Sequence, residues 1–372
     1  MHEGDLAMTG RRPGRLGRLF ARGAALLAAL LLLGLAGCSQ KSKSITYPPA
    51  PDQTGRPWIF DVWGTAANDV YMVGKPGILL HWNGSAWDLR DLGTREALTG
   101  VWGTGPSDVY AVGHKGLVFH YDGSTWSKMT VPTSENLYDV GRGPGDAIYV
   151  CGGRGTVLKL AGGAWVDTPD SAFLYNPAGT ATVDTLVRSR NTIRSLTCVN
   201  SYAISGSDGV VLMSDVSPNR WRLGPIGVKT WLNAGWGSAN LADNWLASDT
   251  GKLYRLQSTL GLLSWLEVSS PSTIAVEAMW GAPDALNYYF VDRDGKIILR
   301  TATGAVRQTV YSGRLWLSGI WGSAANDIYA VGYDATVLHW DGTSWTTLTV
   351  PLPATKALDH AVETDKFGRP LS

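Results

Sequence analysis

The feature that most constrains the fold of this chain is a segment repeated three times in nearly the same form. The copies begin at Val62, Val101 and Ile320 and read VWGTAANDVYMVGKPGILLHWNGSAW, VWGTGPSDVYAVGHKGLVFHYDGSTW and IWGSAANDIYAVGYDATVLHWDGTSW. Weaker copies begin at Ala147, Tyr202, Gly235 and Met279. Residues 58–351 therefore divide into seven units of about 42 residues, the length of one four-stranded unit in a circular repeat architecture.

Each unit divides into four short runs of β-type residues separated by turn residues. In the second unit these runs read LTGVWG, DVYAVG, GLVFHYDG and TWSKMTV, and no repeat contains a long apolar period of 3.6 residues. A lone sheet of this kind cannot bury both faces, so neighbouring sheets must stack, and seven arranged radially bury a continuous core. The repeats predict an all-β fold, a seven-bladed β-propeller of four-stranded antiparallel blades.

The N-terminus carries the features of an export signal. Five arginines precede an apolar run over residues 24–33, which is shorter than the ~20 residues that span a bilayer. The LAGC sequence that ends at Cys38 resembles the lipobox of bacterial lipoproteins. That resemblance implies a signal peptide over residues 1–37, removed before Cys38, whose thiol takes a diacylglycerol and whose amine is acylated, with palmitate as an expected acyl group.

Two segments flank the repeats. Residues 38–57 are rich in Pro, Ser and Lys and are typical of an extended tether, here a lipidated one. Residues 352–372 are a polar C-terminal tail that ends in FGRPLS and has no evident role. Because Ser39 is not the aspartate that retains enteric lipoproteins at the inner membrane, we expect a lipid-anchored protein of the bacterial cell envelope, at the outer membrane. Whether it faces the periplasm or the cell surface stays open.

The turn between the third and fourth strands carries a second resemblance. It reads HWNGSAW, HYDGSTW and HWDGTSW from His81, His120 and His339, and is similar to the Asp-box of bacterial neuraminidase-type repeats. Similar units occur in photosystem-assembly-factor-like propellers and in many bacterial lipoproteins. The resemblance implies a propeller fold but no activity. It also implies that a side chain in each box accepts hydrogen bonds from the turn backbone; these are Asn83, Asp122 and Asp341.

Repetition separates architectural residues from functional ones, since a residue that every blade needs recurs in every blade. Tryptophan recurs in two columns, and a glycine, attributed here to a tight turn, follows the first. The first column is Trp63, Trp102, Trp236, Trp280 and Trp321; the second is Trp87, Trp126, Trp165, Trp221, Trp265 and Trp345. These tryptophans are predicted to pack between blades rather than to bind sugar.

Catalytic and metal-binding groups are sparse. Three histidines share one column and would stand far apart in a ring, so only His114 is unique within the repeats. One histidine makes neither a zinc centre nor a catalytic triad, and Asp292 with Asp294 lacks the further carboxylates of a calcium loop. The chain has 32 Lys and Arg against 31 Asp and Glu, so no excess charge points to nucleic acid. We expect no cofactor and no metal.

The ligand face of a propeller is normally formed by the turns between second and third strands and by the connections between blades. In those turns the first blades carry basic residues and the later blades mostly acidic ones, which predicts a mouth with a basic and an acidic side. An insertion over residues 170–192 should project over this face or rim. The candidates are Lys75, His114, Lys115, Arg154, Asp208, Asp249, Arg293 and Asp334 in the turns, and Phe173, Tyr175, Arg188 and Arg190 in the insertion.

Two cysteines remain besides Cys38. Cys151 and Cys198 lie in adjacent repeats, which permits a disulfide in an oxidising compartment. A position in mid-strand, as for Cys151, is equally typical of a buried free thiol. The pairing is therefore left open.

These features favour a lipid-anchored, monomeric, non-catalytic module that binds a protein, peptide or glycan at its mouth. One alternative is a neuraminidase-like glycoside hydrolase or lyase, which needs three converging arginines, a tyrosine with a glutamate partner and an acidic aspartate. Arg154 and Arg293 lie in blade turns, Arg188 and Arg190 lie in the insertion, and no tyrosine and glutamate pair can be placed with them. The other alternative is a structural part of an envelope assembly machine.

Overall fold

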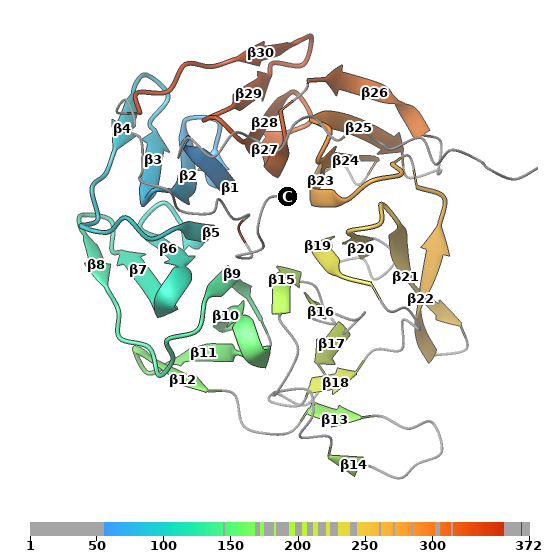
Figure 1. Ribbon diagram of the computed structural model, residues 1–372, viewed down its shortest axis with the longest axis horizontal. Helices are drawn as coiled ribbons and strands as arrows, with labels where there is room; N and C mark the ends of the chain where they lie inside the picture. The colour runs from blue at the N-terminus through green and yellow to red at the C-terminus, as the bar shows by residue number, and fades with distance from the viewer. Residues whose placement is uncertain are drawn as a thin grey trace, which may run out of the picture. The chain divides into compact units, whose positions relative to one another are not determined.

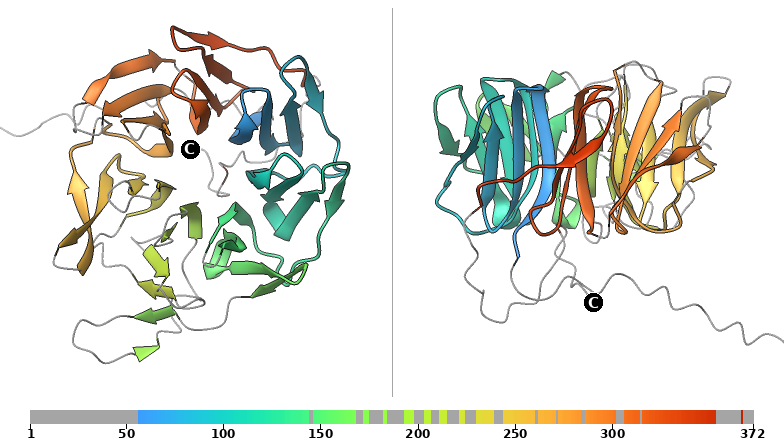
Figure 2. Two further views of the ribbon diagram at one scale, coloured as in Figure 1. Left: turned by 180° about the vertical axis from the view of Figure 1, so that it is seen from behind. Right: turned by 90° about the horizontal axis from the view of Figure 1, so that it is seen from above.

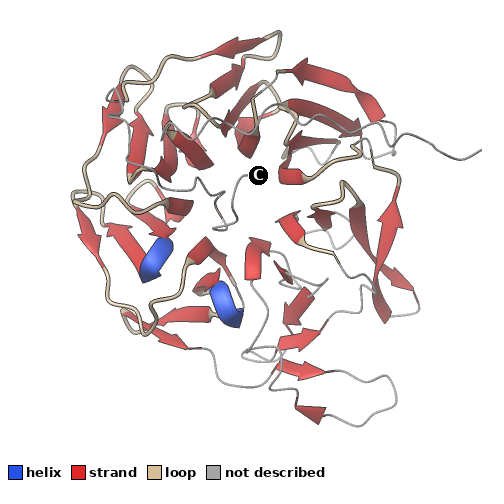
Figure 3. Cartoon of the chain, viewed as in Figure 1, coloured by secondary structure: helices blue, strands red, loops and turns tan. Residues whose placement is uncertain are grey.

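The computed structural model describes residues 56–143, 146–167, 172–174, 182–183, 193–197, 203–206, 211–214, 221–223, 230–238, 244–259, 262–270, 272–283, 286–301, 306–313, 315–352 and 366. The chain divides into two units, Met1–Tyr47 and Pro48–Ser372, and all described residues belong to the second. Strands dominate them, with short 3-10 turns η1 (His114–Gly116) and η3 (Gly153–Gly155) (Figure 3). Among these residues no helix is long and apolar enough to cross a membrane.

Six four-stranded sheets have the form that the repeats predict. Within each sheet the strands pair antiparallel in chain order. Their bounds are β1 (Trp58–Ala66), β2 (Asp69–Lys75), β3 (Ile78–Trp82) and β4 (Trp87–Leu89); β5 (Leu98–Gly105), β6 (Asp108–Gly113), β7 (Leu117–Tyr121) and β8 (Trp126–Lys128); β9 (Leu137–Arg142), β10 (Ile148–Gly152), β11 (Val157–Ala161) and β12 (Ala164–Asp167); β19 (Leu232–Trp236), β20 (Trp245–Ser248), β21 (Leu253–Thr259) and β22 (Leu262–Val268); β23 (Val276–Gly281), β24 (Asn287–Asp292), β25 (Lys296–Thr301) and β26 (Val306–Ser312); β27 (Leu317–Ala324), β28 (Asp327–Gly332), β29 (Val337–Trp340) and β30 (Trp345–Thr347).

The remaining sheet departs from the prediction of seven four-stranded blades. It has six strands in the order β14-β13-β18-β17-β16-β15, with bounds β13 (Ala172–Leu174), β14 (Thr182–Val183), β15 (Ile193–Thr197), β16 (Ala203–Gly206), β17 (Val211–Ser214) and β18 (Trp221–Leu223). Strand β13 pairs parallel to β18. The outer edge of β18 would otherwise present unpaired backbone groups, and the inserted segment supplies strands that cover it. The two inserted strands lie at the rim of the ring (Figure 1).

The sheets are arranged around a common centre, with the first strand of each four-stranded sheet and β15 of the six-stranded sheet innermost (Figures 1 and 2). Strands β1, β5, β9, β15, β19, β23 and β27 each lie beside the next, and β27 lies beside β1. Side chains of successive residues in a strand point to opposite faces, so a strand inside the ring packs against both neighbouring sheets. In β2, Val70 and Met72 pack with Tyr329 and Val331 of the last sheet. The intervening Tyr71 and the following Val73 point to the other face and pack against β5 and β6.

Four tryptophans of the first column each pack against a glycine of the following blade. The ring of Trp63 lies against Gly103, where a Cβ would stand 2.7 Å from Trp63 Cη2 and 2.5 Å from the Asp108 carbonyl oxygen. The same contact joins Trp236 to Gly281, Trp280 to Gly322 and Trp321 to Gly64. The glycine column is therefore needed for close approach of a neighbouring ring. The explanation from a tight turn is wrong, since none of these four glycines has a positive φ.

This interlock predicts a position-specific cost of adding one methyl group. Gly103→Ala is expected to lower the free energy of unfolding by about 1–3 kcal/mol, because the methyl group enters a filled contact. Gly105→Ala, two residues further along β5, is the matched control, since nothing lies within 4 Å of its Cβ position. Urea unfolding should show Gly105→Ala within about 0.5 kcal/mol of wild type. Equal losses in the two variants would contradict the interlock.

Ring closure depends on contacts between the first and last sheets. Trp58 Nε1 donates to Ser318 Oγ at 2.8 Å, and Ser318 Oγ donates to the Ile59 carbonyl at 3.0 Å. An isolated bridge pairs Trp58 with Tyr333, and Arg56 forms an ion pair with Asp334 at 2.7 Å. The first described sheet consists of the consecutive strands β1–β4 and the last of β27–β30. Among the described strands, neither sheet therefore borrows a strand from the other end of the chain to close the ring.

The remaining repeated polar residues are structural, as the repeats predict. Asp122 Oδ1 accepts hydrogen bonds from the backbone of Ser124 and Thr125, each at 2.8 Å, and Asn83 and Asp341 bond in the same way. His120 Nε2 bonds to Asp108 at 2.8 Å, and Asp108 also accepts from Thr104. Burial raises the pKa of Asp108, but these hydrogen bonds outweigh burial and hold the pKa below its usual value. His81 and His339 bond to Asp69 and Asp327 in their own sheets.

Candidate binding face and central cavity

The turns between second and third strands lie on one face of the ring. In five sheets the first turn residue donates its backbone N–H to the carbonyl just before the inner strand of the same sheet. These hydrogen bonds are His114 to Ala97 (2.9 Å), Gly153 to Asn136 (2.8 Å), Asp249 to Trp231 (2.9 Å), Arg293 to Ala275 (3.2 Å) and Tyr333 to Trp316 (2.9 Å). The turns therefore meet the connections between blades, and together they form what we call the turn face.

Four of the candidate charges on the turn face have ion-pair partners. Lys115 Nζ lies 2.6 Å from Glu96 and Arg154 Nε lies 3.4 Å from Glu135, and both partners belong to connections between blades. Asp334 pairs with Arg56, and Arg293 pairs with Glu277. The turn residues alone predict a basic and an acidic side of the mouth. Their ion-pair partners lie outside the turns, carry the opposite charge and reduce this difference.

The other described candidates have local partners. The Lys75 Nζ lies 5.3 Å from the ring centroid of Trp58 and points at this inner aromatic residue. His114 Nε2 bonds to the Lys366 carbonyl at 3.1 Å, and Asp249 accepts from Thr230 Oγ1 at 2.6 Å. Lys115 and Arg154 have side chains 72% and 78% exposed, so they are the candidates most available to a partner.

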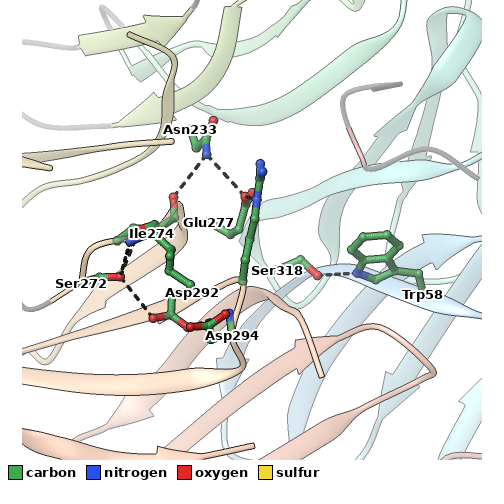
Figure 4. Close-up of polar contacts among 10 residues, drawn as sticks. Trp58, Asn233, Ser272, Ile274, Glu277, Asp292, Asp294 and Ser318 are labelled. Carbon is green, nitrogen blue, oxygen red and sulfur yellow. Dashed lines mark hydrogen bonds and ion pairs between the residues drawn. The ribbon is translucent and has the colours of Figure 1, made fainter. Parts of the chain in front are cut away.

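A buried charge network lies where the turn face meets the inner strands (Figure 4). Arg293 Nε donates to Glu277 Oε1 at 2.5 Å, and the guanidinium stands 4.5 Å from the ring centroid of Trp316. Asn233 Nδ2 donates to the same Glu277 oxygen at 3.5 Å. The Glu277 side chain is only 2% exposed. This carboxylate is therefore held inside the ring by a cation from its own sheet and an amide from the sheet before.

The Asp292 and Asp294 pair belongs to the turn itself. Asp292 accepts from the backbone of Asp294 and Lys296, each at 3.0 Å, and from Ser272 Oγ at 3.2 Å, and burial raises its pKa. Asp294 forms an ion pair with Lys296 at 3.1 Å. In the described part of the chain no group of three His, Cys, Asp or Glu side chains is placed to hold a metal ion.

The inner strands line a partly open central cavity of about 100 Å³. Residues from all seven inner strands line it, and three of them are carboxylates: Asp61 of β1, Asp139 of β9 and Glu277 of β23. Asp61 accepts from the backbone N–H groups of Val62 and Val101, each at 2.9 Å. Burial raises the pKa of Asp61, and the positive charge of Lys366 opposes that rise.

Sequence reasoning missed this cavity, although a signal was present. Three residues before each first-column tryptophan stand Phe60, Thr99, Asn233, Glu277 and Ser318. This column lies in otherwise buried strands, yet it is mostly polar and differs from blade to blade. A residue that does not recur is free to be functional, so the same test that dismissed the tryptophans selects this column.

Several predicted residues lie outside the described part of the chain. They are Cys38, Tyr175, Arg188, Arg190, Cys198 and Asp208, and for Phe173 only the backbone in β13 is described. Cys151 is a buried free thiol in β10, and burial raises its pKa. The two described arginines of the glycosidase alternative, Arg154 and Arg293, belong to separate sheets, and each pairs with its own glutamate.

The fold and the turn face define an all-β propeller with four-stranded antiparallel blades. No family model and no curated protein matches the chain. Among solved structures, YCF48 bound to D1 peptide aligns with a TM-score of 0.58 and 13% identity, over 77% of this chain and 92% of that chain. YCF48 from Cyanidioschyzon merolae aligns with a TM-score of 0.59 and 15% identity, over 77% of this chain and 96% of that chain. The expected likeness to photosystem-assembly-factor propellers is confirmed at the level of the fold.

Proposed function

We propose that this protein is a non-catalytic propeller scaffold that binds a protein or peptide through its turn face. The observation that carries the proposal is the contrast between the two faces. The opposite face repeats the same Asn or Asp turns and His–Asp pairs in three blades, whereas the turns of the turn face in the same three blades read KPG, HKG and YDA from Lys75, His114 and Tyr333. A rigid ring with one variable face suits recognition of one specific partner.

Two further observations support a polypeptide partner. The solved propeller YCF48 that shares this fold is in complex with a D1 peptide. The exposed large apolar residues of the described chain are aliphatic, namely Leu89, Val166, Leu266, Leu286 and Leu315. Glycans are commonly held on exposed aromatic rings, and here the tryptophans pack between blades. These features favour a protein or peptide over a glycan.

The proposal includes the seventh blade and the membrane anchor. Strands β15–β18 keep the antiparallel chain order of a blade, so they would serve as the seventh blade, with β13 and β14 as an added edge. The LAGC sequence supports lipidation at Cys38, which would anchor the scaffold to the outer membrane of a bacterial envelope. Two or three acyl chains suffice for stable anchoring.

Charge reversal on the turn face should abolish partner capture. The protein is purified by affinity tag from gently solubilised envelopes of its host, beside a Lys115→Glu/Arg154→Glu variant. Both side chains are largely exposed, so the fold should persist while the partner meets two reversed charges. We expect recovery of the partner to fall at least ~10-fold, because like charges at an interface cost several kcal/mol.

Arg142→Glu is the matched control, since Arg142 ends β9 next to the turn on the opposite face and pairs with exposed Asp146. This variant should recover the partner as wild type does. Equal recovery by both variants would refute binding at the turn face.

The lipid anchor is tested in the same preparations. Cys38→Ser should leave the membrane fraction and lose the label from a palmitate analogue. A Cys38→Ser protein that is still labelled and membrane-bound would refute the anchor.

A further inference from the structure

The central cavity holds a cation that does not belong to any blade. Lys366 lines the cavity, and it is the only cationic residue among the described lining residues. It lies 14 positions beyond Leu352, the end of the described range that contains the last blade. The other lining residues come from inner strands, whose positions the fold dictates. Lys366 belongs to the C-terminal tail, so the packing of the blades does not by itself require a lysine at this position.

The backbone of Lys366 is held by a hydrogen bond, and its positive charge acts to lower the pKa of groups on two strands. His114, the histidine unique to one blade, bonds through Nε2 to the Lys366 carbonyl at 3.1 Å. The positive charge of Lys366 acts electrostatically on Asp61 of β1 and on Cys151. Cys151 of β10 is in register with Asp139 of β9. The charge therefore lies within range of two of the three cavity carboxylates.

The third carboxylate has its own cation, because Glu277 pairs with Arg293. Lys366 is accordingly the cation that balances the Asp61 and Asp139 side of the cavity. The volume of about 100 Å³ is the free space left beside Lys366 and corresponds to roughly three water molecules. It is too small for most ligands, but without the Lys366 side chain the cavity would accept the head of one lysine or arginine. Desolvated carboxylates bind such a group by charge-assisted hydrogen bonds.

We propose that the central cavity is a binding site for one lysine or arginine side chain of the partner protein, and that Lys366 occupies it as an internal ligand when the partner is absent. The inference deepens the proposed function, since it names a basic residue as the anchor of the bound segment. A tethered lysine competes at a high effective concentration, so the wild-type protein binds a basic segment more weakly than the open cavity does. Buried basic anchors near the centre of an interface are frequent energetic hot spots.

Removing the internal ligand should open the site. The probe is the peptide acetyl-Gly-Lys-Gly-amide, titrated by calorimetry into full-length wild type and into Lys366→Ala. We expect at least ~10-fold tighter binding by Lys366→Ala, since the competing side chain is gone. The same peptide with norleucine in place of lysine should not bind. Lys128→Ala is the control, because Lys128 is an exposed residue of β8, and it should match wild type.

The carboxylate requirement is tested in the opened protein. Lys366→Ala/Asp61→Asn and Lys366→Ala/Asp139→Asn should each lose at least ~10-fold in affinity for the lysine peptide, with thermal melts verifying the fold. If one double variant does not fold, the other decides. Equal affinity of wild type and Lys366→Ala, or of the lysine and norleucine peptides, would overturn the proposal. Capture of a partner that depends on Lys115 and Arg154, without any gain in Lys366→Ala, would leave the scaffold function standing and remove only the cavity site.

Discussion

Replacing Trp58 with alanine is expected to lower the free energy of unfolding by about 3–5 kcal/mol, the range for large aromatic residues removed from a core. Trp58 is 1% exposed and packs edge-on against Trp316 and Tyr333, with ring centroids 5.0 and 5.3 Å away. The variant also loses the hydrogen bond to Ser318 and the ring under the Lys75 ammonium. These losses fall together at the junction that closes the ring. Urea unfolding followed by tryptophan fluorescence measures the change.

The location of the damage distinguishes ring closure from ordinary core packing. Amide hydrogen exchange in Trp58→Ala should rise in β1, β27 and β28 and change little in β9 and β10, which lie away from the junction. Trp126→Ala is the control, because Trp126 belongs to the repeated outer column and is only half-buried in β8. It should cost about 1–2 kcal/mol. A Trp58→Ala protein with wild-type stability, or with exchange raised evenly around the ring, would show that these contacts do not close it.

The architecture is readable from the sequence because each blade repeats its requirements. The tryptophan column that includes Trp63 and the glycine column that includes Gly103 mark the contact between consecutive blades, and a period near 42 residues predicts a ring of four-stranded blades in chain order. The six-stranded sheet is not readable in this way. Strand β13 pairs parallel to β18 from a segment that occurs once, and the pairing of an inserted strand with an open edge leaves no periodic signature. The prediction that every blade has four strands is therefore wrong at the one long insertion.

The turn face is predictable for the same reason, but its charge balance also depends on residues outside the turns. Strand alternation places Lys115 and Arg154 on one face, whereas their partners Glu96 and Glu135 lie in connections between blades. These partners are missed when the turns are read alone, although the pairing repeats, since 19 positions separate Glu96 from Lys115 and also Glu135 from Arg154. The central cavity was missed because attention stayed on columns that recur. Part of its lining, namely Thr99, Asn233, Glu277 and Ser318, lies in the column that differs from blade to blade, and that column was passed over because it does not recur.

Arg293→Ala is expected to lower the free energy of unfolding by about 3–5 kcal/mol, because it leaves a buried carboxylate without its cation. Glu277 is 2% exposed, and Arg293 is its ion-pair partner at 2.5 Å. The variant also removes the guanidinium that stands over Trp316. Asn233 still reaches Glu277, but one neutral amide does not replace the positive charge beside a buried carboxylate. Urea unfolding at neutral pH measures the loss.

Arg154→Ala tests the same type of turn in another blade. Arg154 also pairs with a glutamate, at 3.4 Å from Glu135, but its side chain is 78% exposed, and exposed pairs contribute about 0–1 kcal/mol. The double variant Arg293→Ala/Glu277→Gln should recover part of the stability lost in Arg293→Ala, since the uncompensated charge is removed along with its partner. Losses of equal size in Arg293→Ala and Arg154→Ala, or no recovery in the double variant, would show that burial of the Glu277 charge does not set the cost. Recovery would show that Arg293 is required in this ring to neutralise the buried charge of Glu277.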